Sequence, residues 1–249
     1  MYVIGFSKSG ITWLSYLLSY CLNAEYSDLD FPDSLSIDQE LHSYLKGGLD
    51  HQSYQAQLGK IIKTNNLDIS DQDTTPVVYM VRDGRDAILS YYYSQNPSID
   101  KGNPHAPQTS LVSKVFRKAG FQDLSTRLEL SPFSRFLDCH LSEWVSHVTI
   151  WLDRNPIAII RYEDLQAIPE QTLASLMLRL GVEVSSEVIT QAVEIFDLKS
   201  IPQYQLKQKN KKSVGNPGDW QKHFSKKDRT YFRDKAGKIL FNLGYEGET

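Results

Sequence analysis

The chain has 249 residues, of which 41% are hydrophobic and 23% are charged, and this balance excludes an intrinsically disordered chain and a bundle of membrane helices. The formal net charge of −3 argues against a protein whose whole surface attracts nucleic acid, so any anion site has to be local. A chain of this length fits one large domain, and we expect a single domain over residues 1–249.

Short apolar runs along the chain predict buried strands. They are continuously apolar rather than alternating, which is typical of strands covered on both faces of a parallel sheet, and they lie at 2–6, 60–64, 76–82 and 157–161. Helical patterns alternate with these runs and follow them. This order predicts an α/β fold, a single three-layer domain with a central parallel β-sheet.

The predicted helices have recognisable ends. They cover 12–22, a segment capped by Asp83, 138–154, the segment from Pro169 to a stop at Gly181, and the segment from Ser225 to a stop at Gly244. Asp228 follows Ser225 by three residues and completes a variant capping box. Between about 95 and 135 the pattern gives way to a polar, proline-containing stretch, which predicts an irregular lid or binding loop.

The two cysteines and the first apolar helix bear on the compartment. Cys21 and Cys139 lie in apolar helical patterns, which predicts buried, reduced thiols, and no metal-ligand spacing is present. The apolar run at 11–22 is shorter than a membrane span and lacks the cleavage site of a secretory signal peptide. We therefore expect a cytoplasmic protein without a membrane span.

The segment GFSKSGITWL, which follows the first predicted strand, has the composition of an anion-binding loop. Backbone N–H groups and the positive end of a helix dipole meet at a strand, loop and helix junction. Lys8 adds a full charge there, Ser9 and Thr12 add hydroxyl groups, and Gly10 allows a tight turn. Lys8 precedes the last glycine of the loop, whereas a Walker A loop has its lysine after it, which disfavours an ordinary ATP or GTP site. Trp13 suits stacking on a base or, equally, packing in the core.

A second segment, VVYMVRDGRDAILSYYYS, ends a predicted strand in Arg82. Ligands of open α/β sheets bind at the carboxyl ends of the strands, and the planar guanidinium of arginine suits phosphate. Ser90 lies eight residues later on the predicted helix. Asp83 and Asp86 fit the N-cap and N3 positions of that helix, so we interpret both as structural.

These motifs together resemble those of the cytosolic-type sulfotransferases, which use 3′-phosphoadenosine-5′-phosphosulfate (PAPS) and release 3′-phosphoadenosine-5′-phosphate (PAP). SKSGITWL is similar to the family's PKSGTTWL, and RDGRDAILSYYYS to its 3′-phosphate-binding segment. RYEDL at 161–165 and GDWQKHF at 218–224 match the family's YEDL and GDWKNHF, in the same order along the chain.

The resemblance implies a donor site and its parts. Lys8 would stabilise the charge on the oxygen between phosphate and sulfate, while Ser9, Gly10 and Thr12 would hold the 5′-phosphate. The remaining implied donor contacts are Trp13 and Tyr162 at the adenine, Arg82 and Ser90 at the 3′-phosphate, and Ser213 and Gly215 in the segment before GDW. Ser213 stands where the family has a cation, and Lys211 and Lys212 are the candidates to supply the missing charge.

The general base is the largest departure from the family pattern. The family's KTH reads KTN here, so Lys63 is in place to steady the sulfuryl group, but Asn65 replaces the histidine that would accept a proton. His105, in the proline-containing stretch, and Glu25, after the first helix, are the two candidates for the missing base.

The sequence thus predicts a sulfotransferase that moves the sulfuryl group of PAPS to a hydroxyl or amine of a small-molecule acceptor, most simply an alcohol, without a metal. Two alternatives stay open. One is a P-loop kinase with an atypical loop, which would need Mg²⁺, and the other is a PAP- or PAPS-binding protein that has lost catalysis. The acceptor and the oligomeric state are not indicated, and neither nucleic acid nor a membrane is an expected partner.

Overall fold

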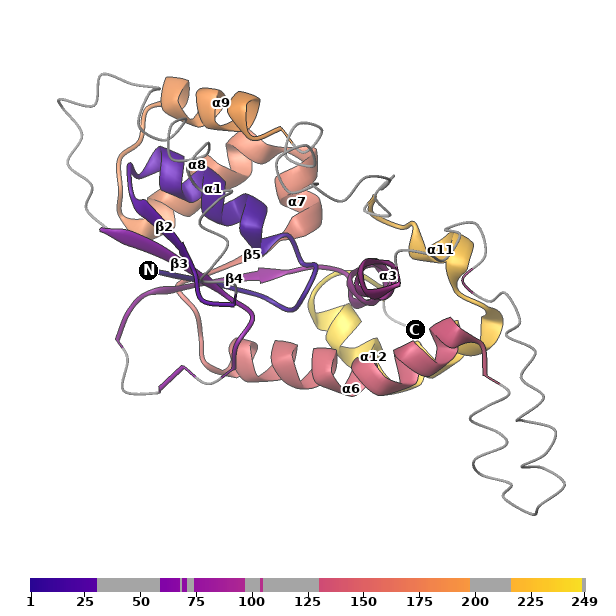
Figure 1. The fold of residues 1–249 in the computed structure, drawn as a ribbon. Helices are drawn as coiled ribbons and strands as arrows, with labels where there is room; N and C mark the ends of the chain where they lie inside the picture. The colour runs from indigo at the N-terminus through magenta and orange to yellow at the C-terminus, as the bar shows by residue number, and fades with distance from the viewer. Residues whose placement is uncertain are drawn as a thin grey trace, which may run out of the picture. The chain divides into compact units, whose positions relative to one another are not determined.

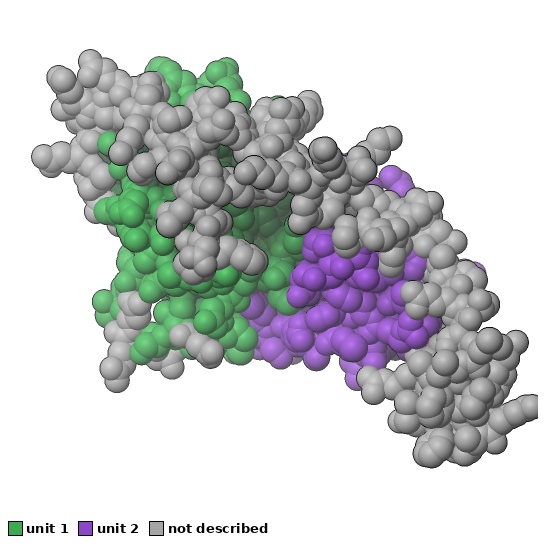
Figure 2. Space-filling model, in the orientation of Figure 1, with its two compact units in different colours: residues 1–82, 150–211 green, residues 83–149, 212–249 purple. Residues whose placement is uncertain are grey.

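The structure is a computed structural model of the chain. It describes residues 1–30, 59–67, 69–70, 74–96, 104, 130–197 and 216–247. The chain divides into two compact units, one of residues 1–82 and 150–211 and the other of residues 83–149 and 212–249 (Figure 2).

The first unit contains a five-stranded sheet in the order β2-β3-β1-β4-β5, with every neighbouring pair parallel (Figure 1). The strands are β1 (Tyr2–Ile4), β2 (Glu25–Asp28), β3 (Lys60–Thr64), β4 (Val77–Val81) and β5 (Ala158–Arg161). The predicted α/β fold with a central parallel sheet is confirmed. That residues 1–249 make up one domain stays a prediction.

Helices α1 (Ile11–Cys21), α7 (Tyr162–Ala167), α8 (Pro169–Leu180) and α9 (Ser186–Ile195) gather over one face of this sheet (Figure 1). One core cluster joins them to the strands, because Leu14 and Leu17 of α1 and Leu173 and Leu176 of α8 are fully buried with Val78. The ends of α8 follow the sequence, with Pro169 in its first turn and Gly181 in the left-handed conformation after it.

The second unit is helical and contains α3 (Gly84–Gln95), α11 (Trp220–His223), α12 (Lys226–Asn242) and most of α6 (Pro132–Asp153). Trp144 of α6 is completely buried and packs on Phe232 of α12, with ring centroids 5.7 Å apart. The predicted capping box is confirmed, because the backbone N–H of Ser225 donates to Asp228 and that of Asp228 donates to the Ser225 hydroxyl.

Three sequence expectations need correction. Strand β2 was missed because Glu25–Asp28 is a polar strand at the sheet edge. Helix α6 begins at Pro132, inside the stretch expected to be irregular, because proline suits a first helical turn. Cys139 is exposed rather than buried, because the buried side of α6 is formed by Leu137 and Leu141, and a residue two positions after Leu137 points away from it.

In the part of the chain that the structure describes, no helix combines the length and apolar character that crossing a bilayer requires.

Candidate functional site

The loop after β1 has the backbone of an anion-binding turn. Lys8 and Gly10 both adopt left-handed conformations, with φ of 69° and 93°, and the Ser9 N–H donates to the Phe6 carbonyl at 3.0 Å. Gly10 is the N-cap of α1 and offers no side-chain cap, so the first-turn N–H groups of α1 face the loop without a capping oxygen from that position. Thr12 is half-buried in the same turn.

Ser9 supplies a buried hydroxyl to this loop. The residue is 1% exposed, and its Oγ has no hydrogen-bond partner among the residues that the structure describes. A buried hydroxyl usually has a partner, because leaving it unsatisfied costs about 1–3 kcal/mol. A phosphate oxygen at the N-terminus of α1 would satisfy it, so the residues present fit an anionic group here.

Arg82 connects the loop to Tyr162, a further predicted site residue. It is 4% exposed at the carboxyl end of β4, and its Nη1 donates to the Lys8 carbonyl at 2.9 Å. Its guanidinium carbon lies 4.3 Å from the centroid of the Tyr162 ring, a distance that permits a cation–π contact. The structure therefore places Arg82 in contact with both the Lys8 backbone and the Tyr162 ring.

Trp13 lies beside Tyr162 but within the core. Its ring centroid is 6.2 Å from that of Tyr162 in an edge-on arrangement, it is 6% exposed, and its indole N–H donates to the Phe196 carbonyl at 2.8 Å. These contacts fix the ring firmly through burial and a hydrogen bond. Its predicted role against adenine stays a prediction.

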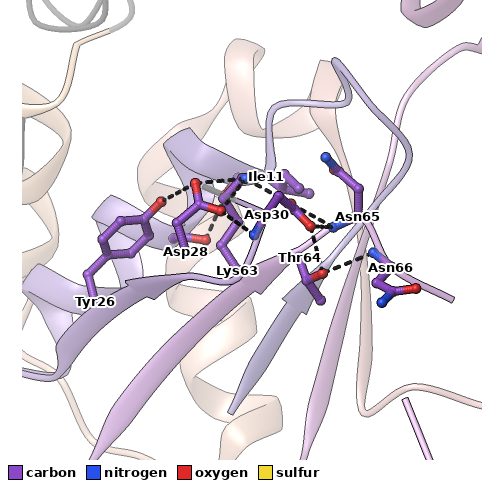
Figure 3. A network of polar contacts seen from close by, with 9 residues as sticks. Ile11, Tyr26, Asp28, Asp30, Lys63, Thr64, Asn65 and Asn66 are labelled. Carbon is purple, nitrogen blue, oxygen red and sulfur yellow. Dashed lines mark hydrogen bonds and ion pairs between the residues drawn. The ribbon is translucent and has the colours of Figure 1, made fainter. Parts of the chain in front are cut away.

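A second group of polar side chains lies where β2 and β3 end (Figure 3). Lys63 is 4% exposed, and its Nζ lies 2.9 Å from both carboxylate oxygens of Asp28 and 3.1 Å from Oδ2 of Asp30. Asp30 also accepts hydrogen bonds from the Thr64 hydroxyl at 2.9 Å and from the Asn65 backbone N–H at 2.9 Å. The sequence predicted Lys63, but it did not single out either aspartate.

The two predicted bases have different positions. Glu25 is exposed at the amino end of β2, where it forms an ion pair of 3.5 Å with Lys60. His105 lies outside the described residues, as do Ser213 and Gly215. Ser90 is 9% exposed in α3 of the second unit. The roles of these residues stay predictions.

In the second unit, the first turn of α3 binds the backbone of the turn at Gly218 and Trp220. The Asp86 carboxylate accepts hydrogen bonds from the backbone N–H groups of Gly218 at 2.7 Å and Trp220 at 2.9 Å. The guanidinium of Arg85 lies over the Trp220 ring at 4.0 Å. Burial opposes the charge of Arg85, but hydrogen bonds and attraction from Asp83 and Glu246 outweigh it and raise the pKa of the guanidinium.

Asp86→Ala is expected to lower the free energy of unfolding by about 2 kcal/mol, because it leaves two backbone donors without their charged acceptor. Urea unfolding measures this loss. Asp234→Ala removes an exposed carboxylate from α12 and is the matched control, with an expected change below about 0.5 kcal/mol. Equal midpoints for the two variants would contradict the role given to Asp86.

Comparisons with known proteins agree with the motifs. A family model described as a sulfotransferase domain matches residues 1–240. No curated protein matches the chain. Among solved structures, mouse sulfotransferase SULT7A1 complexed with PAP is similar over 98% of this chain and 84% of its own, with 17% identity and a TM-score of 0.61.

Retinol dehydratase is similar in two solved complexes. The complex with androsterone and the inactive cofactor PAP has 16% identity, and the complex with retinol and PAP has 17%. Each match has a TM-score of 0.54 and covers 96% of this chain and 80% of that one. At these identities the likeness shows the fold.

Proposed function

Because the chain belongs to the family of sulfotransferase domains, we propose that it transfers the sulfuryl group of PAPS to a hydroxyl or amine of a small-molecule acceptor, most simply an alcohol. The observation that carries the proposal is the contact of Arg82 with both the Lys8 carbonyl and the Tyr162 ring. It joins in one place three residues that the motifs assign to a single donor.

In this proposal the loop after β1 binds the 5′ end of the donor. The buried hydroxyl of Ser9, the backbone of Gly10 and the hydroxyl of Thr12 hold the 5′-phosphate at the N-terminus of α1. Lys8 is exposed on the loop and stabilises the negative charge that develops on the bridging oxygen as the sulfur–oxygen bond breaks.

The other donor contacts follow from the motifs. Arg82 and Ser90 bind the 3′-phosphate, which distinguishes PAP and PAPS from ATP and AMP. Trp13 and Tyr162 lie against the adenine. Ser213 and Gly215 complete the site in the segment before GDW, and we carry them over from the family pattern alone.

Lys63 stabilises the sulfuryl group during an in-line displacement. We propose that this displacement requires no metal ion. The similar structures contain PAP, and in two of them androsterone or retinol as well, which supports a nucleotide donor and a small acceptor here. We further propose a cytoplasmic location, as the resemblance to cytosolic-type enzymes implies.

Thermal melting with nucleotides tests the donor. PAP at 100 times its Kd is expected to stabilise the protein by about 2.7 kcal/mol, which corresponds to about 5–10 °C in Tm for a chain of this size. AMP, which lacks the 3′-phosphate, is expected to raise Tm by less at the same concentration. A PAP shift no larger than that of AMP would contradict the proposal, and a larger shift with ATP and Mg²⁺ would favour the kinase alternative.

Activity separates the enzyme from a binding protein without catalysis. With donor carrying radiolabelled sulfate, the protein is expected to form labelled products with at least one member of a panel of phenols and alcohols. Stabilisation by PAP without any labelled product would favour the catalytically degenerate alternative.

A further inference from the structure

The carboxyl edge of the sheet carries two acidic side chains, Asp28 and Asp30, that the motifs do not include. All five strands are parallel, so their carboxyl ends meet at one edge. Asp28 ends β2 opposite Lys63, and Thr64 ends β3 opposite Ile4, the last residue of β1. Asp28 and Lys63 therefore lie at the edge where the loop with Lys8 begins, whereas Glu25 lies at the amino end of β2.

Asp30 is built into this edge by three donors from β3 and the residue after it. One oxygen accepts the Thr64 hydroxyl, and the other accepts both the Asn65 N–H and the Lys63 ammonium, at 2.9–3.1 Å (Figure 3). The carboxylate thus contacts the backbone of Asn65, the position at which the family pattern has its histidine. An acid brought to that place can take over the task that asparagine cannot perform.

The two aspartates differ in what they contact. Both oxygens of Asp28 lie 2.9 Å from the Lys63 Nζ, and the Tyr26 hydroxyl donates to one of them at 3.3 Å. Asp28 is therefore the main counter-ion of Lys63. The side chain of Asp30 is 19% exposed, compared with 11% for Asp28 and 5% for Lys63. Asp30 is the member of the group that an acceptor can reach most easily.

Charge also favours Asp30. The two carboxylates and the one ammonium together carry one negative charge in excess. A proton that arrives on Asp30 removes the excess and leaves the ion pair of Lys63 with Asp28 intact. Protonation of Asp30 therefore leaves the Lys63 ammonium paired with the Asp28 carboxylate, and no charge of this group is left without an opposite charge.

We propose that Asp30 is the general base of the transfer, an inference that rests on the proposed function. As the acceptor oxygen forms its bond to sulfur, its O–H bond breaks and the proton moves to a carboxylate oxygen of Asp30. The bond between sulfur and the bridging oxygen breaks in the same displacement, and its electron pair leaves with the 5′-phosphate. Asp30 then returns the proton to water. Asp28 is a positioning residue that acts through Lys63.

The test compares Asp30→Asn with Asp28→Asn on acceptors of graded acidity, using radiolabelled donor. A base matters most when the acceptor holds its proton tightly, and general-base catalysis contributes about 10²–10⁴-fold. With benzyl alcohol, D30N is therefore expected to lower kcat at least about 100-fold, and with 4-nitrophenol less than about 10-fold. D28N, which changes the same charge, is expected to lower both rates by a similar factor.

Rescue gives a second readout. Asn65→His in the D30N background places an imidazole at the neighbouring position and is expected to recover at least about tenfold of the rate with benzyl alcohol. The Tm shift with PAP reports folding and donor binding for every variant. If D30N does not fold, Asp30→Glu, which keeps the charge but moves the carboxylate by one methylene group, is expected to show the same unequal loss.

The outcomes are distinct. The assignment of Asp30 would be overturned if D30N, or D30E in its place, lost the same factor of rate with both acceptors or lost none. The rate and the PAP shift of the wild-type protein would in that case still support the proposed function. Failure of D30N/N65H to recover any rate, with its PAP shift intact, would also count against it. If the wild-type protein transfers sulfate to no acceptor, the proposed function fails and this inference fails with it.

Discussion

Lys8→Ala is expected to lower kcat by a factor of about 10²–10³, the loss that follows when one preorganised group is removed from a developing oxyanion. Lys8 is exposed on the loop, so its side chain can reach a bound donor, while its carbonyl is held by Arg82 at 2.9 Å. The charge on the bridging oxygen is largest when the bond to sulfur breaks. The interaction is therefore stronger in the transition state than in the ground state, and its removal lowers kcat more than donor affinity.

The substitution leaves the loop itself nearly unchanged. Alanine keeps the Cβ atom, so the cost of the left-handed conformation at position 8, where φ is 69°, is the same in both proteins. PAP keeps the former bridging oxygen as a charged terminal oxygen of its 5′-phosphate. K8A is therefore expected to lose part of the Tm shift that PAP produces and to keep the part that the other donor contacts supply. Steady-state rates with radiolabelled donor and melting with PAP measure the two effects separately.

Lys60→Ala is the matched control for K8A. Lys60 is a half-exposed lysine at the amino end of β3, paired with Glu25 on the opposite edge of the same sheet. Its removal is expected to change kcat by less than about twofold, because an exposed ion pair contributes about 0–1 kcal/mol to stability and Lys60 lies at the amino ends of the strands, away from the carboxyl edge at which the loop with Lys8 begins. Near-normal turnover by K8A, or an equal loss in K60A, would contradict the role given to Lys8.

The parts of the fold that were predictable are those determined by local chemistry. Continuous apolar runs identified four of the five strands. Burial on both faces requires such a run in β4, whereas β5 lies at the sheet edge, leaves Ile159 42% exposed and was identified by its apolar composition. The cap of α12 was predictable from Ser225 and Asp228, which are three residues apart. Strand β2 was not predictable from local sequence, because Glu25–Asp28 forms a strand by pairing with β3 across a sequence separation of 35 residues.

The candidate site divides in the same way. Lys8, Arg82 and Tyr162 were identified from motifs, and in the structure Arg82 contacts both the Lys8 carbonyl and the Tyr162 ring. Their roles toward the donor stay predictions. The position of Asp30 was not predictable, because its partners lie 33–35 residues away and no spacing rule connects them. The contacts of Asp86 were equally hidden. A position suited to capping α3 also holds the turn at Gly218, 132 residues further on.

Gly10→Ala is expected to destabilise the protein by about 2–5 kcal/mol and to abolish the PAP-dependent Tm shift. Two costs add. A φ of 93° is unfavourable for any residue with a Cβ, at about 1–2 kcal/mol. The new methyl group would also lie 2.6 Å from Cδ2 of Tyr162, which is buried under the guanidinium of Arg82 and has little room to move. Overpacking of this kind costs about 1–3 kcal/mol.

Gly181→Ala separates the two costs, because Gly181 also has a left-handed φ of 69° but no atom lies within 4 Å of the added Cβ. It is expected to cost about 1 kcal/mol and to keep the PAP shift. The difference in urea midpoint between the two variants then measures the contact of position 10 with Tyr162. If G10A were no less stable than G181A, Tyr162 would not pack against the loop, and the link from Lys8 through Arg82 to Tyr162 would lose its support. If G10A were less stable yet kept the full PAP shift, the loop would pack as described but would not hold the 5′-phosphate.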